Sequence, residues 1–394
     1  MELNHPDRER LLAWLADRES DMIALLEKVV NIDSLSRHEE GVAAVAEAFR
    51  ESLEASGVKT RLHQFPGYGP CLVAGVNVEP GPTSNHYLLM GHMDTVFPVG
   101  TAKQRPFSIK DNIGYGPGVA DMKAGDVMNA FILKAFAELD IKTKRPLLAL
   151  FTCDEEIASP ASRNLIMDMA RNSRAVFNAE PGRVSGNFVT ERKGAFFIDF
   201  EVLGIPAHSG VNHDKGRSAI EALAHKILEL HALTDRATGV TANVGTVHGG
   251  QTINTVAPHV KAQLDVRFPH TVDKDALYKR ITDIITAVHV DGTSARITHE
   301  SNFLPLFRTE RSDKVIEIYR EAARSVGLNI DGEATGGSAD SGFSSAVGAP
   351  TVCGTGPVGG NAHTPEEYCE LWTFVPRAQT VASSILALEN ESDA

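Results

Sequence analysis

The chain has 394 residues and a formal net charge of −13, which predict about two domains and argue against a nucleic-acid partner. Its four cysteines are scattered along the sequence, which predicts reduced thiols and neither a disulfide framework nor a thiolate zinc site. Residues 1–10 are polar and charged, unlike a secretory signal, and no segment is long enough to span a membrane. We therefore expect a cytoplasmic protein with no membrane partner.

The first predicted elements alternate between helix and strand, as in an α/β sheet. Residues 7–30 predict an amphipathic helix, and the hydrophobic run 88–91 predicts a strand that leads into His92. Asp94 follows two positions later, and alternate residues of a strand share a face. A carboxylate beside the second ring nitrogen of a metal-bound histidine fixes its tautomer, although such a pair is more often an ordinary hydrogen bond. The pair alone leaves both interpretations open.

Further acidic and imidazole side chains follow predicted strands or lie in loops. They are Asp121 in the Gly-rich turn 116–125, Glu155 and Glu156 after strand 146–153, Glu180 after strand 175–179, and His363 in the loop 359–367. Each alone would be interpreted as a solvated polar residue, but an open α/β sheet places its site where several strands end. Imidazole and carboxylate suit zinc, and two ions about 3.5–4 Å apart need one carboxylate that binds both. The set therefore predicts a two-metal site.

The pattern changes near residue 190, where strands and helices follow the order β-α-β-β-α-β of a ferredoxin-like unit. They are strands 196–203, 241–248, 259–268 and 294–300 and helices 217–233 and 273–289. After about residue 303 the α/β pattern returns, with helices 312–326 and 372–390 around strand 350–354. We therefore predict an α/β protein of two domains. Residues 1–190 and 304–394 form a discontinuous domain that carries the metal site, and residues 191–303 form an inserted ferredoxin-like domain.

Five motifs carry a resemblance to a known family. They are Gly-His-Met-Asp-Thr-Val at 91–96, Gly-Val-Ala-Asp-Met-Lys-Ala-Gly at 118–125, Cys-Asp-Glu-Glu at 153–156, Asn-Ala-Glu-Pro at 178–181 and Asn-Ala-His-Thr at 361–364. In this order and spacing they resemble, over nearly the whole chain, the co-catalytic zinc hydrolases. That family includes glutamate carboxypeptidase, acetylornithine deacetylase, succinyl-diaminopimelate desuccinylase and aminoacylase, and the resemblance is greatest to the glutamate carboxypeptidase branch.

The resemblance implies two zinc ions per subunit, with Co²⁺ or Mn²⁺ able to substitute. His92, Asp121 and Glu180 would bind one ion, and Asp121, Glu156 and His363 the other. Asp94 would orient His92, and Glu155 would act as the general base. Because successive side chains of an extended segment point opposite ways, we expect Glu155 to face the substrate while Glu156 binds metal.

The resemblance also implies that the inserted domain is a lid and the surface of a homodimer. His208 would reach the partner's site and stabilise the tetrahedral oxyanion, although without the family it would be interpreted as a surface turn residue. Asn254 and Arg267 would bind a substrate carboxylate, which suits the planar guanidinium fork of arginine. Arg267 keeps the alternative of an exposed strand-end charge. Gly336 and Gly337 would line the same pocket with backbone N–H groups.

The predicted activity is zinc-dependent hydrolysis of an amide bond in a small peptide or N-acyl amino acid with a free carboxylate, as in glutamate carboxypeptidase. The alternative is an N-acyl-amino-acid deacylase or desuccinylase, which shares the metal residues and differs in its pocket. A remote alternative is an inactive binding homologue, which predicts loss of Glu155 or of a zinc ligand, and all are present. The glutamate-releasing members carry a lysine where Gly186 or Asn187 stands here, with Arg183 a candidate substitute.

Overall fold

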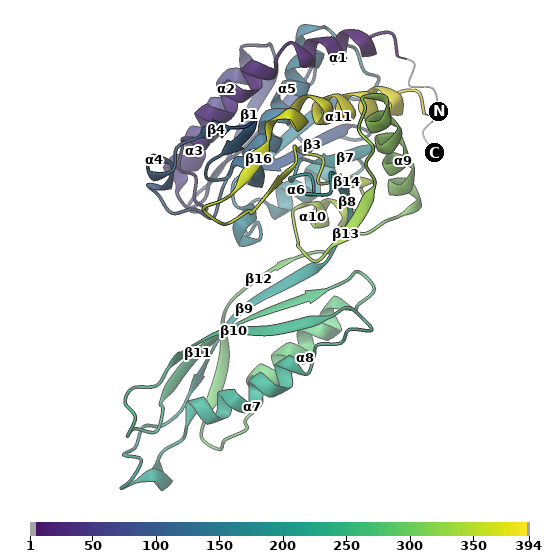
Figure 1. Ribbon diagram of the computed structural model, residues 1–394. Helices are drawn as coiled ribbons and strands as arrows, with labels where there is room; N and C mark the ends of the chain where they lie inside the picture. Colours follow the sequence, from purple (N-terminus) through teal and green to yellow (C-terminus); the bar gives the residue numbers. More distant parts are fainter. Residues whose placement is uncertain (1–4, 392–394) are drawn as a thin grey trace. The chain divides into compact units, whose positions relative to one another are not determined.

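The computed structural model describes residues 5–391 (Figure 1), so the first four residues of the polar N-terminal segment lie outside the described part. The chain divides into two compact units. The larger unit comprises the described residues up to Glu191, Leu306–Thr335 and those from Ala339 onward, and the smaller comprises Arg192–Pro305 and Gly336–Ser338. Both units mix helix and strand, which confirms the predicted α/β class. The segment Gly336–Ser338 groups with the smaller unit, although the predicted boundary placed it in the discontinuous domain.

The larger unit is built on an eight-stranded sheet with the strand order β1-β2-β6-β3-β7-β14-β8-β13. Its strands are β1 (Lys59–Phe65), β2 (Gly69–Val76), β3 (Tyr87–His92), β6 (Leu147–Thr152), β7 (Ala175–Asn178), β8 (Phe188–Arg192), β13 (Gly332–Thr335) and β14 (Thr351–Cys353). β3 pairs in parallel with β6 and β7, and β14 pairs in parallel with β7. The carboxyl ends of these four strands therefore meet at one edge of the sheet, where open α/β sheets carry their sites.

Helices cover this sheet, and its central strands β2, β3, β6 and β7 are buried along their whole length. The helices of the larger unit are α1 (Arg8–Ala16), α2 (Glu19–Val30), α3 (Glu39–Glu54), α4 (Thr101–Gln104), α5 (Ala124–Glu138), α6 (Arg163–Ala170), α9 (Glu310–Ser325), α10 (Ser341–Ala346) and α11 (Phe374–Leu388). The prediction of a single helix over residues 7–30 is wrong. The helix breaks at Asp17 and Arg18, and the two halves share α5 as a partner, while α1 also packs on α11 and α2 also packs on α3. Within residues 5–391, no helix combines the length and the apolarity that crossing a bilayer requires.

A second, four-stranded sheet of the larger unit has the order β15-β16-β5-β4. Its strands are β4 (Ser108–Lys110), β5 (Ile113–Tyr115), β15 (Gly359–Gly360) and β16 (Tyr368–Glu370), and the short helix η4 (Leu371–Thr373) follows. β15 and β16 form an antiparallel pair, and both contact the short helical turn η1 (Val119–Lys123). The loop between β15 and β16, which carries His363, is therefore held beside the turn that carries Asp121.

The smaller unit is an antiparallel four-stranded sheet with the order β10-β11-β9-β12 and two helices on one face (Figure 1). Its elements are β9 (Gly194–Leu203), η3 (His213–Lys215), α7 (Ala219–His231), β10 (Thr241–Gly249), β11 (His259–Phe268), α8 (Lys274–Thr286) and β12 (Ser294–Phe303). Alternate residues of β11 are buried, as expected for a strand with one face on a core. This order of elements is the β-α-β-β-α-β order that the sequence predicts.

Candidate metal centre and active site

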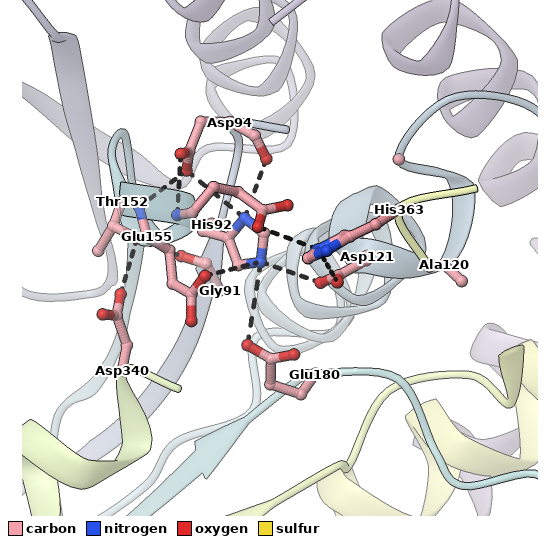
Figure 2. Close-up of polar contacts among 12 residues, drawn as sticks. Gly91, His92, Asp94, Ala120, Asp121, Thr152, Glu155, Glu180, Asp340 and His363 are labelled. Carbon is pink, nitrogen blue, oxygen red and sulfur yellow. Dashed lines mark hydrogen bonds and ion pairs between the residues drawn. The ribbon is translucent and has the colours of Figure 1, made fainter. Parts of the chain in front are cut away.

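The end of β3 positions His92. A Cβ atom on the preceding Gly91 would lie 2.0 Å from the Oδ1 atom of buried Asp126, so the chain can approach α5 this closely only with glycine there. The Nδ1 atom of His92 lies 3.0 Å from the backbone oxygen of Asp94 and 3.5 Å from its carboxylate (Figure 2). The contact of Nδ1 with Asp94 turns Nε2 towards Asp121 and Glu180, the orientation in which Nε2 would be the ligand atom.

Asp121 stands between two groups of candidate ligands. Figure 2 shows it joined to His92, whose Nε2 atom lies 3.2 Å from Oδ1, and to His363, whose Nε2 atom lies 3.3 Å from Oδ2. His363 also lies 3.1 Å from Glu156, and His92 lies 3.9 Å from Glu180. The ligand atoms within each group all lie within 4.8 Å of one another. The structure thus brings together all five residues that the sequence proposed as metal ligands.

The turn that carries Asp121 is irregular. Asp121 has φ −110° and ψ 91° inside η1, and the peptide bond between Asp121 and Met122 is cis. Two residues later, the buried Lys123 ammonium donates to the backbone oxygens of Val29 and Ile32, at 2.9 and 2.8 Å. These carbonyls lie at the C-terminal end of α2, where a cation is favourable. The turn is therefore anchored to α2 immediately before α5 begins.

The adjacent glutamates do not lie on an extended segment, so the predicted reason for their divergence is wrong. They open the 3₁₀ turn η2 (Glu155–Ile157), in which successive side chains are rotated by about 120°. Glu156 Oε2 faces His363, whereas Glu155 Oε2 lies 3.9 Å from His92 Nε2. Both backbone N–H groups of the pair donate to the Asp94 carboxylate, at 3.1 and 3.2 Å. Asp94 therefore holds the glutamate turn as well as His92.

Burial dominates the electrostatics of this carboxylate-rich site. It raises the pKa of Glu155 well above its usual value, against the opposing charge of His92, and together with Asp121 it raises the pKa of Glu156 to about 7. Burial also disfavours ionised Asp121, but hydrogen bonds from His363 and His92 outweigh it and hold the pKa of Asp121 below its usual value. Glu156 Oε1 is buried and accepts no hydrogen bond from the described residues. Crowded carboxylates, two imidazoles and an unpartnered oxygen are a donor set that fits divalent cations.

Sequence reasoning missed the buried groups that support these ligands. Ser36 Oγ donates to Asp94 Oδ2 at 2.5 Å. Asp340 accepts hydrogen bonds from Thr152, at 3.0 Å, and from Ser159, so it ties the end of β6 to the chain beyond η2. The sequence could have indicated Asp340, because it follows Gly336 and Gly337 in the Gly-rich loop. Ser36 carried no such signal, since its partner lies 58 positions away.

In the smaller unit, His208 and Asn254 lie side by side. Their segments are joined by a β-bridge from His208 to Thr255 and by a hydrogen bond from Ser209 N–H to the Asn254 backbone oxygen at 2.9 Å. Both side chains are exposed to solvent. This pair therefore stands at the surface of the unit, free to meet another molecule.

Arg267 lies elsewhere in the same unit. Its guanidinium donates to both carboxylate oxygens of Asp265, at 2.8 and 3.1 Å, and to Ser338 Oγ at 3.1 Å, beside Gly336 and Gly337. The strand register pairs Arg267 with Ala195, near the start of β9, whereas His208 follows its far end. About 27 Å of strand separates Ala195 from Leu203, the last residue of β9. The structure thus brings Arg267 to the Gly-rich loop but does not bring it to His208.

The fold and the donor groups define a metal-dependent hydrolase with an inserted ferredoxin-like unit. The chain belongs to Peptidase family M20/M25/M40, whose family model matches residues 88–387. This membership confirms the resemblance that the five motifs carry.

One known relative matches nearly the whole chain and another matches about half of it. Carboxypeptidase G2 of Pseudomonas sp. (strain RS-16) is 26% identical over 380 residues, which cover 94% of this chain and 89% of that protein. Acetylornithine deacetylase of Photorhabdus laumondii subsp. laumondii is 31% identical over 195 residues, which cover 46% of this chain and 49% of that protein. The crystal structure of Sso-CP2, an M20 family metallo-carboxypeptidase from Sulfolobus solfataricus, has the same fold, with a TM-score of 0.76 at 19% identity over 93% of this chain and 99% of that chain.

Proposed function

We propose that this protein is a glutamate-carboxypeptidase-like metallopeptidase with two Zn²⁺ ions per subunit. Its substrate is a small peptide or N-acyl amino acid that carries a free carboxylate. The observation that carries the proposal is the position of Asp121, which offers one carboxylate oxygen to each of two donor groups. Similarity to Carboxypeptidase G2 over 94% of the chain supports the peptidase assignment.

The residues present fit two such ions. His92, Asp121 and Glu180 would hold one, Asp121, Glu156 and His363 the other, and the unpartnered Oε1 atom of Glu156 gives the second group a spare donor. Nitrogen and oxygen donors of this kind suit Zn²⁺, with Co²⁺ or Mn²⁺ as replacements. Bound divalent ions would polarise the scissile carbonyl and acidify water.

The side chains then divide the proton transfers. Glu155 takes the proton of the attacking water and delivers it to the leaving amine nitrogen, for which its largely buried carboxylate near His92 is well placed. Asp94 fixes the position of Glu155 by accepting its backbone N–H, and fixes the orientation of His92. His208 donates a hydrogen bond to the oxyanion that forms at the former carbonyl oxygen when water adds to the carbonyl carbon.

The separation of His208 from Arg267 supports a homodimer. One copy of the smaller unit cannot present both side chains to one reaction centre, because about 27 Å of β9 lies between them. We assign Arg267 and the Gly336–Gly337 loop to the substrate carboxylate of their own subunit. His208 and Asn254 serve the site of the partner subunit. Exposed apolar side chains on α7 and β10, at Ile220, Leu228 and Val247, supply the kind of surface that such a dimer covers.

The side-chain preference of the enzyme departs from glutamate release. Arg183 already pairs with a carboxylate of this chain, because its Nε donates to Glu333 Oε1 at 3.0 Å. Ser185 and Asn187 donate to the same carboxylate, at 2.9 and 3.2 Å. The cluster is thus already neutralised by its own glutamate, and we propose that release of other C-terminal residues equals or exceeds release of glutamate.

A substrate panel tests the proposal. N-blocked dipeptides ending in glutamate, alanine or leucine should be cleaved by the Zn²⁺- and Co²⁺-loaded protein more efficiently than N-acetyl or N-succinyl amino acids, measured as kcat/KM. The opposite order would favour the second candidate, an N-acyl-amino-acid deacylase, for which the partial similarity to acetylornithine deacetylase is the supporting observation. Loss of all hydrolysis with both ions bound would leave only a binding role.

A further inference from the structure

Glu367 is a buried carboxylate that no part of the proposed reaction uses. Its side chain has no solvent exposure, and it lies under the turn that carries Asp121. Three backbone N–H groups of this turn donate to the Glu367 carboxylate: those of Gly118 at 3.2 Å, Ala120 at 2.9 Å and Asp121 at 3.0 Å. Glu367 therefore holds the backbone of Asp121 itself.

The same residue also belongs to the loop that carries His363. The Glu367 N–H donates to the Thr364 backbone oxygen at 3.3 Å, which closes the segment between β15 and β16. The His363 side chain is 53% exposed, so little packing holds it in place. One carboxylate thus links the two loop-borne ligands of the site, Asp121 and His363.

The other ligands have different supports. His92 ends β3 and Glu180 follows β7, two neighbouring parallel strands of the buried sheet. Glu156 lies on the turn held by Asp94. Two of the three donors in the group Asp121, Glu156 and His363 therefore lie on segments that the Glu367 side chain joins, against one of three in the group His92, Asp121 and Glu180.

We propose that Glu367 is a positioning residue that sets the metal affinity of the Asp121–Glu156–His363 group selectively over that of its neighbour. The inference rests on the proposed two-ion centre. A group that orients metal ligands from outside is typically worth about 10–100-fold in metal affinity. A loss of metal affinity at one group and not at the other distinguishes this role from a general contribution to folding.

Stepwise titration of the apo full-length protein with Co²⁺, followed by calorimetry and visible absorption, measures both sites. In Glu367→Ala we expect one dissociation constant to rise by about 10–100-fold and the other to change much less. Glu367→Gln should recover part of the loss, because its amide oxygen can still accept from Ala120 and Asp121. Glu366→Ala, at the exposed neighbouring glutamate, is the matched control and should bind both ions as the wild type does.

Double variants assign the affected step to its site. In a His363→Ala background, where the second group is already broken, Glu367→Ala should add little, whereas in a Glu180→Ala background its full effect should persist. Equal weakening of both steps, or no change in either, overturns the inference. If Glu367→Ala does not fold, as judged by circular dichroism, Glu367→Gln carries the same comparison. A wild-type protein that binds a single ion overturns the proposed two-ion centre as well, whereas two ions in the wild type and an unaffected variant overturn this inference only.

Discussion

The two units hold their polar functional residues in opposite ways. In the larger unit, His92 and Asp94 are 1% and 0% exposed, and each is fixed by other side chains or by backbone of the same chain. In the smaller unit, His208 and Asn254 are exposed and make local hydrogen bonds, with Nδ1 of His208 accepting from the Gly210 N–H at 3.2 Å and Oδ1 of Asn254 accepting from the Thr252 hydroxyl at 2.9 Å. All groups of the candidate metal centre therefore come from one chain. The proposed roles of His208 and Asn254 require a substrate or a second subunit.

The largest effect should come from the residue shared by both donor groups. Asp121→Ala removes the ligand that belongs to both, so we expect both ions to be lost and kcat/KM to fall by about 10³-fold or more, since bound metal contributes several kcal/mol to the transition state. Metal analysis after dialysis, alongside an exposed control such as Asp140→Ala, checks this. Retention of two ions by Asp121→Ala would show that Asp121 does not bridge them.

The adjacent glutamates should separate chemistry from metal binding. Glu155→Gln should lower kcat by about 100-fold or more while both ions stay bound, because a general base contributes about that much. Glu156→Gln should instead weaken one ion, because Glu156 faces His363. Kinetics and metal content of the two variants decide the matter, and swapped phenotypes would reverse the roles assigned to the pair.

The smaller unit's dependence on a partner can be tested by complementation. His208→Ala and Glu155→Gln protomers should each be nearly inactive. After subunit exchange, an equal mixture should regain up to about a quarter of wild-type activity, because half of the dimers are mixed and each mixed dimer has one intact site. Exchange should be followed by size or by differently labelled subunits. Demonstrated exchange without recovered activity would place His208 outside the partner's site.

The sequence carried the fold and the five metal-ligand candidates, because strand ends such as His92 and Glu180 are marked by the hydrophobic runs before them. It could not supply contacts between loops that are distant in the chain. Glu367 meets Asp121 across 246 positions, and no periodicity records such a meeting. Local backbone choices also escaped it. The glutamate pair lies in a 3₁₀ turn in which Asp94 accepts two successive N–H groups, and the predicted first helix is interrupted at Asp17 and Arg18.

The smallest predicted effect concerns Ser36, which belongs to the buried hydrogen-bond network of the larger unit. Its hydroxyl donates to Asp94 Oδ2 at 2.5 Å, whereas the hydroxyl of nearby Ser34 donates to the Met93 backbone oxygen at 2.8 Å. Both serines are buried and both variants to alanine remove one oxygen atom, so they form a matched pair. Ser36→Ala leaves Asp94 with only the two glutamate N–H groups and the His92 ring, and should cost about 1.5–3 kcal/mol of unfolding free energy, against about 1 kcal/mol for Ser34→Ala.

The kinetic outcome should separate the two variants more clearly than stability does. Because Asp94 positions Glu155, a small displacement of this carboxylate misplaces the general base, and misplacement by about 1 Å costs up to about 100-fold. We therefore expect Ser36→Ala to lower kcat by about tenfold with KM nearly unchanged, and Ser34→Ala to leave both close to wild type. Denaturant unfolding and steady-state kinetics on both variants provide the measurements. An equal fall in kcat for the two variants would mean that activity responds to any loss of packing around the buried site. The hydrogen bond from Ser36 to Asp94 would then have no specific effect on the glutamate turn.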